Sequence, residues 1–223
     1  MKVNLKINDS PVSVEAGATI LEAAELLDIR IPTLCHMKMD CLNFEHRSGS
    51  CRVCVVEVKG RPNLAPACST PVTEGMEVHT NTLRAINARR TILDLLLSDH
   101  PKDCLICPKN LDCQLQALAQ ELGLHHLLYK GEQSTYNRDL SSKAIARDLD
   151  KCIMCRRCET ACNVIQTVGV LSGVGRGFEA VVAPAGLKPL VETECVFCGQ
   201  CVQACPVGAL TEMDYKYPVR RML

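Results

Sequence analysis

Two cysteine runs in the second half of the sequence constrain the fold more than any other feature. The segments DKCIMCRRCETAC (150–162) and TECVFCGQCVQACP (193–206) share the spacing Cx2Cx2Cx3C. Two copies of one spacing predict two halves related by pseudo-symmetry. The chain has 16 cysteines in 223 residues but no Trp, three Phe and four Tyr. We therefore expect something other than bulky side chains to fill part of the interior.

These spacings predict two iron–sulfur clusters. Close, regular cysteine spacings in a chain without a secretory signal indicate metal binding rather than disulfides. In such a run the first three thiolates surround one iron–sulfide cube, and the fourth reaches the neighbouring cube. Two [4Fe–4S] clusters with crosswise ligands follow. One uses Cys152, Cys155, Cys158 and Cys205, and the other uses Cys195, Cys198, Cys201 and Cys162. Two zinc sites, the alternative, fit these triple runs poorly.

A third group of cysteines lies near the N-terminus. Cys51 and Cys54 form a CxxC pair, with Cys35 upstream and Cys68 downstream. This layout is related to that of plant-type two-iron ferredoxins, although their Cx4Cx2C spacing is absent. It predicts one [2Fe–2S] cluster on Cys35, Cys51, Cys54 and Cys68, with a four-cysteine zinc site as the alternative. Cys41 could replace Cys35, but its polar surroundings favour a free surface thiol.

The segment HPKDCLICPKNLDC (100–113) holds the three remaining cysteines, Cys104, Cys107 and Cys113. A four-iron cube needs a fourth ligand, and His100 can supply one ring nitrogen. Three cysteines and a histidine also form a common zinc set. Because three other clusters are already predicted in this chain, we favour a third [4Fe–4S] cluster, whose histidine should make reduction easier, as it does in Rieske centres.

Hydrophobic patterning predicts an α+β chain with several parts. Alternating apolar residues on both sides of Asn8-Asp9-Ser10-Pro11 predict a hairpin, and Thr19 with Glu22 predicts a capping box. A helix is expected after residue 81, with a stripe of Leu83, Ile86, Leu93 and Leu97, and a second from about Leu111 to Gly123. The predicted domains are 1–80 (two-iron), 81–123 (His/Cys four-iron), a connector at 124–148, 149–214 (double four-iron) and a tail at 215–223.

The four groups, in this order, resemble the N-terminal iron–sulfur region of iron-only hydrogenases and of the large iron–sulfur subunit of respiratory complex I. The segments GSCRVCVVEVKG, NLAPACSTP, HPKDCLICPKNLDCQLQ and the double cysteine repeat carry the resemblance. It implies a β-grasp two-iron ferredoxin domain, a small helical four-iron domain and a bacterial two-cluster ferredoxin domain. It also implies the ligand sets given above. Because the sequence ends nine residues after Asp214, we expect no catalytic domain within it.

The resemblance implies an electron-transfer subunit of an NAD(P)-linked hydrogenase, formate dehydrogenase or transhydrogenase, possible electron bifurcation included. Expected partners are a flavin/NAD(P)-binding subunit, a small [2Fe–2S] subunit, and ferredoxin or a catalytic hydrogenase or formate dehydrogenase subunit. Whether the chain itself is an enzyme stays open. A free-standing polyferredoxin shuttle and a redox sensor acting through Cys41 are the alternatives.

Charge and hydropathy bear on location and partners. Lys and Arg balance Asp and Glu, so the formal net charge is zero. Nothing in this balance indicates a nucleic-acid or membrane surface. No apolar run approaches the roughly 20 residues that a membrane helix needs. We expect a cytoplasmic protein that has no membrane span and does not bind nucleic acid.

Overall fold

The computed structural model describes residues 1–39, 44–46 and 49–215. The chain divides into two compact units. The first unit contains Met1–Ser98 with Ala117–Lys130, and the second contains Asp99–Gln116 with the described residues from Gly131 onward. Residues 81–123, predicted as one small domain, are therefore shared between the two units. No helix among the described residues is long and apolar enough to cross a membrane.

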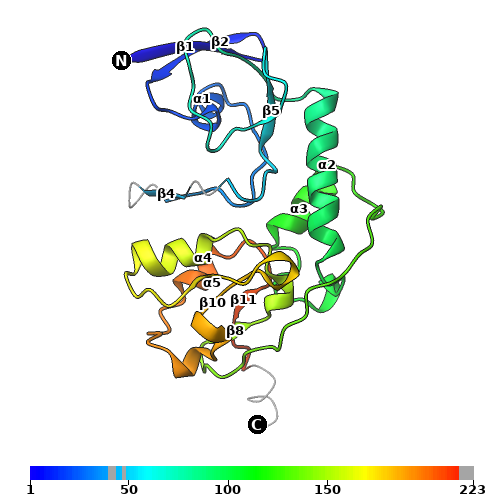
Figure 1. Cartoon of the computed structure of the whole chain (residues 1–223), viewed down its shortest axis with the longest axis vertical. Coiled ribbons are helices and arrows are strands. Elements are labelled where there is room, and N and C mark those ends of the chain that lie inside the picture. Colours follow the sequence, from blue (N-terminus) through cyan, green and yellow to red (C-terminus); the bar gives the residue numbers. More distant parts are fainter. Residues whose placement is uncertain (40–43, 47–48, 216–223) are drawn as a thin grey trace. The chain divides into compact units, whose positions relative to one another are not determined.

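A mixed five-stranded sheet in the order β2-β1-β7-β5-β6 forms the frame of the first unit. Figure 1 labels strands β1, β2 and β5 of this sheet. Its strands are β1 (Lys2–Ile7), β2 (Ser10–Glu15), β5 (Val55–Val58), β6 (Ala65–Pro66) and β7 (Glu77–His79). The β1–β2 hairpin confirms the prediction. Its turn residues Asn8 and Asp9 have φ values of 47° and 68°, and positive φ at both positions gives the twist that two-residue hairpins favour.

Helix α1 (Ile20–Glu25) contributes to the hydrophobic core on this sheet, which gives the expected β-grasp arrangement. The predicted capping box is present. The Glu22 N–H donates to the Thr19 hydroxyl at 3.2 Å, and the Thr19 N–H donates to the Glu22 carboxylate at 2.6 Å. Ile20, Ala23 and Ala24 are buried with Val3, Leu5 and Ile7 of β1. A small hairpin of β3 (Met37–Met39) and β4 (Phe44–His46) precedes the CxxC pair.

Helix α2 (Leu83–Ser98) and helix α3 (Gln114–Glu121) differ in detail from the sequence expectation. Of the predicted stripe on α2, Leu93 is fully buried, whereas Leu83 is 74% exposed. Arg89 and Asp94 are buried instead, and both bind backbone groups. Helix α3 begins three residues after Leu111, because the φ value of 66° at Leu111 is left-handed and does not fit a right-handed helix.

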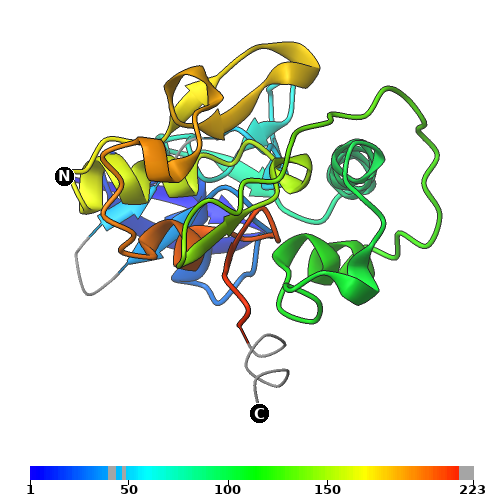
Figure 2. The same cartoon turned by 90° about the horizontal axis from the view of Figure 1, so that it is seen from below.

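The second unit has little regular structure. Strand β8 (Ile145–Arg147) pairs with β11 (Leu210–Glu212), and β9 (Ser172–Val174) pairs with β10 (Val181–Ala183). Strands β9 and β10 therefore form a hairpin between the two cysteine runs. The short helices are η2 (Cys104–Ile106), η3 (Leu149–Lys151), α4 (Arg157–Thr160), η4 (Ala161–Ile165), η5 (Gly177–Glu179), η6 (Ala185–Leu187), η7 (Leu190–Glu192) and α5 (Gln200–Ala204). Residues 127–138 form a segment without helix or strand (Figure 2).

Candidate functional site: four groups of thiols

The first group lies beside the β-grasp sheet. Cys35, Cys51, Cys54 and Cys68 are all buried, with exposures of 6% or less. Cys35 donates its backbone N–H to the Cys51 sulfur at 3.4 Å. Hydrogen bonding with Cys35 and burial raise the pKa of Cys51, and contacts with Cys35 and Cys54 raise that of Cys68. A hydrogen bond from Cys68 lowers the pKa of Cys54 to about 7, against the effect of burial.

These four thiols thus form one connected group, and Cys41 lies outside the described residues. Arg89 on α2 binds backbone groups next to this group of thiols. Its guanidinium is 2% exposed and donates to the Val55 carbonyl at 2.8 Å and to the Thr80 carbonyl at 2.8 Å. Val55 is the first residue of β5 and directly follows Cys54, so Arg89 holds the backbone next to that thiol. Burial lowers the pKa of Arg89, and the charge of Cys54 opposes that effect.

The second group contains Cys104, Cys107 and Cys113, which follow His100. Backbone hydrogen bonds from Cys107 to Cys104 (3.2 Å) and from Asn110 to Cys107 (2.9 Å) make this loop tight. Burial raises the pKa of Cys113, and the other two thiols are close enough to add to the rise. His100 is 8% exposed, and its Nδ1 has no hydrogen-bond partner in the described part of the chain. Burial, followed by the Lys151 charge, lowers the pKa of His100.

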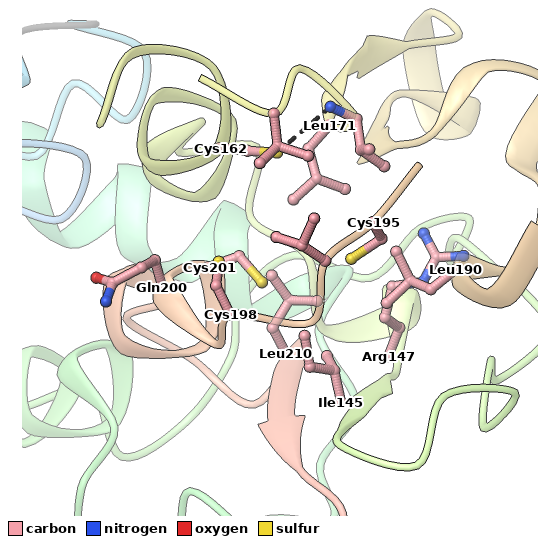
Figure 3. Close-up of a pocket in the computed structure, with 13 residues that line it drawn as sticks. Ile145, Arg147, Cys162, Leu171, Leu190, Cys195, Cys198, Gln200, Cys201 and Leu210 are labelled. Atoms are coloured by element: carbon pink, nitrogen blue, oxygen red, sulfur yellow. Dashed lines mark hydrogen bonds between the residues drawn. The ribbon is translucent and has the colours of Figure 1, made fainter. Parts of the chain in front are cut away.

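The third and fourth groups line two separate pockets of the second unit. One pocket is lined by Cys152, Cys155, Cys158 and Cys205. The other is lined by Cys162, Cys195, Cys198 and Cys201, whose side chains surround the space in Figure 3. Each pocket therefore brings together the first three cysteines of one run and the last cysteine of the other run. This is the crosswise arrangement that the spacing predicts.

Apolar side chains complete both pockets. Leu149, Val182 and Val207 line the first, and Val170, Leu171 and Leu190 line the second. Burial raises the pKa of Cys155 and of Cys201 to about 12, and it raises that of Cys158 as well. The Val170 N–H donates to the Cys162 sulfur at 3.4 Å (Figure 3). A pocket with apolar walls, four thiols and amide donors suits an inorganic cluster, whose sulfur atoms accept hydrogen bonds.

The backbone repeats the same conformation in both runs. Met154 and Arg156 have positive φ, and so do Phe197 and Gly199, which occupy the same two positions relative to the first cysteine. Positive φ costs about 1–2 kcal/mol at a residue with a side chain. Such strain persists where the surrounding structure requires it, often at ligand sites. The repeat is therefore one of three-dimensional structure as well as of sequence.

The second unit also buries charges that the sequence does not mark. Arg147 lines the second pocket and pairs with Asp139 at 2.7 Å, and Lys151 directly precedes Cys152. Arg147 and Lys151 are each 2% exposed or less. Charged residues are expected at the protein surface. The only sign of burial that the sequence offers for such a residue is its position within an apolar segment. Among the described residues, no three His, Cys, Asp or Glu side chains are arranged to hold a single metal ion.

Comparison with known families agrees with this geometry. Residues 1–83 match the 2Fe-2S iron-sulfur cluster binding domain, residues 89–127 match the NADH-ubiquinone oxidoreductase-G iron-sulfur binding region, and residues 189–211 match the 4Fe-4S binding domain. The chain is 57% identical over 218 residues to the NADP-reducing hydrogenase subunit HndD of Solidesulfovibrio fructosivorans. It is 32% identical over 222 residues to the NADH-ubiquinone oxidoreductase 75 kDa subunit of Reclinomonas americana.

The chain is like the N-terminal iron–sulfur region of these proteins. The matches include 97% and 98% of this chain but only 37% and 30% of the two relatives, so the chain spans well under half of their lengths. This iron–sulfur region also matches a chain in the crystal structure of an NAD+-reducing [NiFe]-hydrogenase in the H2-reduced state. The TM-score is 0.84 at 28% identity, with 96% of this chain and 88% of that chain covered. The predicted α+β fold is thereby confirmed.

Proposed function

We propose that the chain is an iron–sulfur electron-transfer subunit of an NAD(P)-linked hydrogenase or of an oxidoreductase similar to complex I. The observation that carries the proposal is the pair of crosswise thiol pockets, each lined by four cysteines from both runs. The family matches and the likeness to HndD support it. A cytoplasmic location is part of the proposal.

The proposed cofactors are one [2Fe–2S] and three [4Fe–4S] clusters. The proposed ligands are Cys35, Cys51, Cys54 and Cys68 for the two-iron cluster; His100, Cys104, Cys107 and Cys113 for the next; and the crosswise sets of the two pockets for the others. When bound, such clusters accept and donate single electrons. The chain's own residues bury seven of the described thiols and donate backbone hydrogen bonds to sulfur, and burial and hydrogen bonding are factors through which a protein sets a cluster's reduction potential.

The partners we propose at one end of the electron path are a flavin/NAD(P)-binding subunit and a small [2Fe–2S] subunit. At the other end we propose ferredoxin, or a catalytic hydrogenase or formate dehydrogenase subunit. HndD is named as a subunit of an NADP-reducing hydrogenase, which favours the hydrogenase class. Size-exclusion chromatography of the chain purified from its native source tests the partners. Co-elution with a flavoprotein is expected, whereas a stable monomer would favour a free-standing shuttle.

Anaerobic purification followed by iron, sulfide and zinc analysis tests the clusters. The proposed ligand sets predict about 14 irons per chain and no stoichiometric zinc. His100→Cys should keep that iron count and change one low-temperature EPR signal. His126→Cys is the matched control, because His126 is exposed and belongs to no thiol group. A preparation without iron would contradict the proposed function, and spectra unchanged by His100→Cys would remove His100 from the ligand set.

A further inference from the structure

Lys151 is a buried cation at the junction of two thiol groups. Its side chain is 2% exposed, and its ammonium contacts Asp103 at 3.0 Å and Asp148 at 3.2 Å. Asp148 is shared, because Arg138 also contacts it at 2.7 Å. Removing an ammonium from water costs several kcal/mol unless carboxylates compensate. The two carboxylates explain how the charge is tolerated, but they do not explain why a lysine occupies this place.

The contacts of Lys151 supply a reason. A Cβ atom placed on Gly208 would lie 2.7 Å from the Cys107 sulfur and 3.4 Å from Cδ of Lys151. Lys151 and Cys107 therefore pack around the same point. Gly208 follows Cys205 by three residues, and Lys151 immediately precedes Cys152. Lys151 thus lies where the proposed His100 cluster meets the proposed cluster of Cys152, Cys155, Cys158 and Cys205.

The charged contacts agree with this position. The Lys151 ammonium contacts Asp103 at 3.0 Å, and Asp103 directly precedes Cys104. The fixed positive charge of Lys151 therefore lies beside the loop that carries Cys104 and Cys107 of one proposed ligand set.

We propose that Lys151 tunes the reduction potential of one cluster. Its fixed positive charge stabilises the reduced form of the cluster held by His100, Cys104, Cys107 and Cys113. This inference rests on the proposed function. With both clusters bound, transfer between them would move one electron, oxidising one cluster and reducing the other, and no bond would form or break. A nearby cation would stabilise the added negative charge, and more strongly where the cation is shielded from water, as the 2% exposed Lys151 side chain is. Lys151 therefore favours the electron on the His100 side of the junction.

The test is an EPR-monitored redox titration of the anaerobically purified chain with Lys151→Met. We expect the ratio of reduced to oxidised His100 cluster at a fixed ambient potential to fall at least tenfold, which equals about 59 mV for a one-electron couple. His100→Cys identifies the signal to follow. Arg138→Gln is the matched control: it also removes a cation from Asp148, but the Arg138 side chain is 59% exposed, and solvent screens its charge. We expect less than a twofold change there.

Asp103→Asn tests the sign. It removes a negative charge from the same cluster of groups, so the ratio should rise. If Lys151→Met fails to retain its iron, Lys151→Gln, which removes the charge, is compared with Lys151→Arg, which keeps it. Unchanged ratios in an iron-replete Lys151→Met or Lys151→Gln variant would overturn the inference while leaving the proposed function intact. Absence of iron from the wild-type chain would instead overturn the proposed function.

Discussion

Gly208→Ala should disturb the junction between two proposed clusters. The new methyl carbon would lie 2.7 Å from the Cys107 sulfur, whereas nonbonded heavy atoms are most stable at about 3.5–4.0 Å. Either Cys107 or the segment after Cys205 must therefore move by about 1 Å. Both alternatives displace a proposed ligand. Overpacking of this kind costs about 1–3 kcal/mol, which corresponds to a factor of about 5–150 in an equilibrium or rate.

The assay is the rate at which the visible iron–sulfur absorbance disappears in a fixed concentration of denaturant, together with the iron retained per chain. Gly131→Ala is the matched control, because Gly131 also lacks a positive φ and a Cβ atom added there would meet no atom within 4 Å. Replacing glycine at such positions restricts the unfolded chain equally in both variants. Gly208→Ala should lose absorbance about 5–150 times faster than the control. Equal rates and equal iron contents would refute the reasoning.

Two further predictions concern the second unit. Asp139 accepts hydrogen bonds from Arg147 at 2.8 Å and from the Leu190 N–H at 2.9 Å, and Arg147 is 2% exposed. Asp139→Asn leaves a buried cation without its anion, so chemical denaturation should show a loss of about 3–5 kcal/mol, against less than about 1 kcal/mol for Glu121→Gln in the exposed pair with Arg30. Separately, Cys155 and Cys201 thiols with pKa values of about 12 are protonated at neutral pH without iron. Iron binding must release these protons, so a chelator should remove iron faster as pH falls from about 9 to about 6. A rate independent of pH would contradict this linkage.

Much of the candidate site could be predicted from cysteine spacing, because the spacing depends only on residues that are close together in the sequence. A Cx2Cx2Cx3C run confines three thiols to one loop by chain length alone, and the fourth cysteine begins the segment that leads away. The crosswise grouping of Cys162 and Cys205 in the structure follows from that repeat. The capping box of Thr19 and Glu22 and the hairpin at Asn8-Asp9 are local for the same reason.

Helix α2 is an element in which hydrophobic periodicity did not predict the buried residues correctly. Periodicity placed Leu83 in the buried stripe, but the side chain is 74% exposed, while Arg89 is buried because its guanidinium reaches the backbone carbonyls of Val55 and Thr80. Those carbonyls come from segments outside the helix, so no window of sequence along α2 contains the information.

By itself, therefore, the sequence determined which thiols can share a site, since ligand spacing is a property of consecutive residues. Only the tertiary structure decided which charges lie beside those sites. Lys151, Asp103 and Gly208 come from three separated segments, and the packing that brings them to Cys107 depends on the whole second unit. Charged side chains are expected in solvent unless the fold buries them. Here tertiary packing buries Lys151 next to the thiols, where its charge is not screened by water.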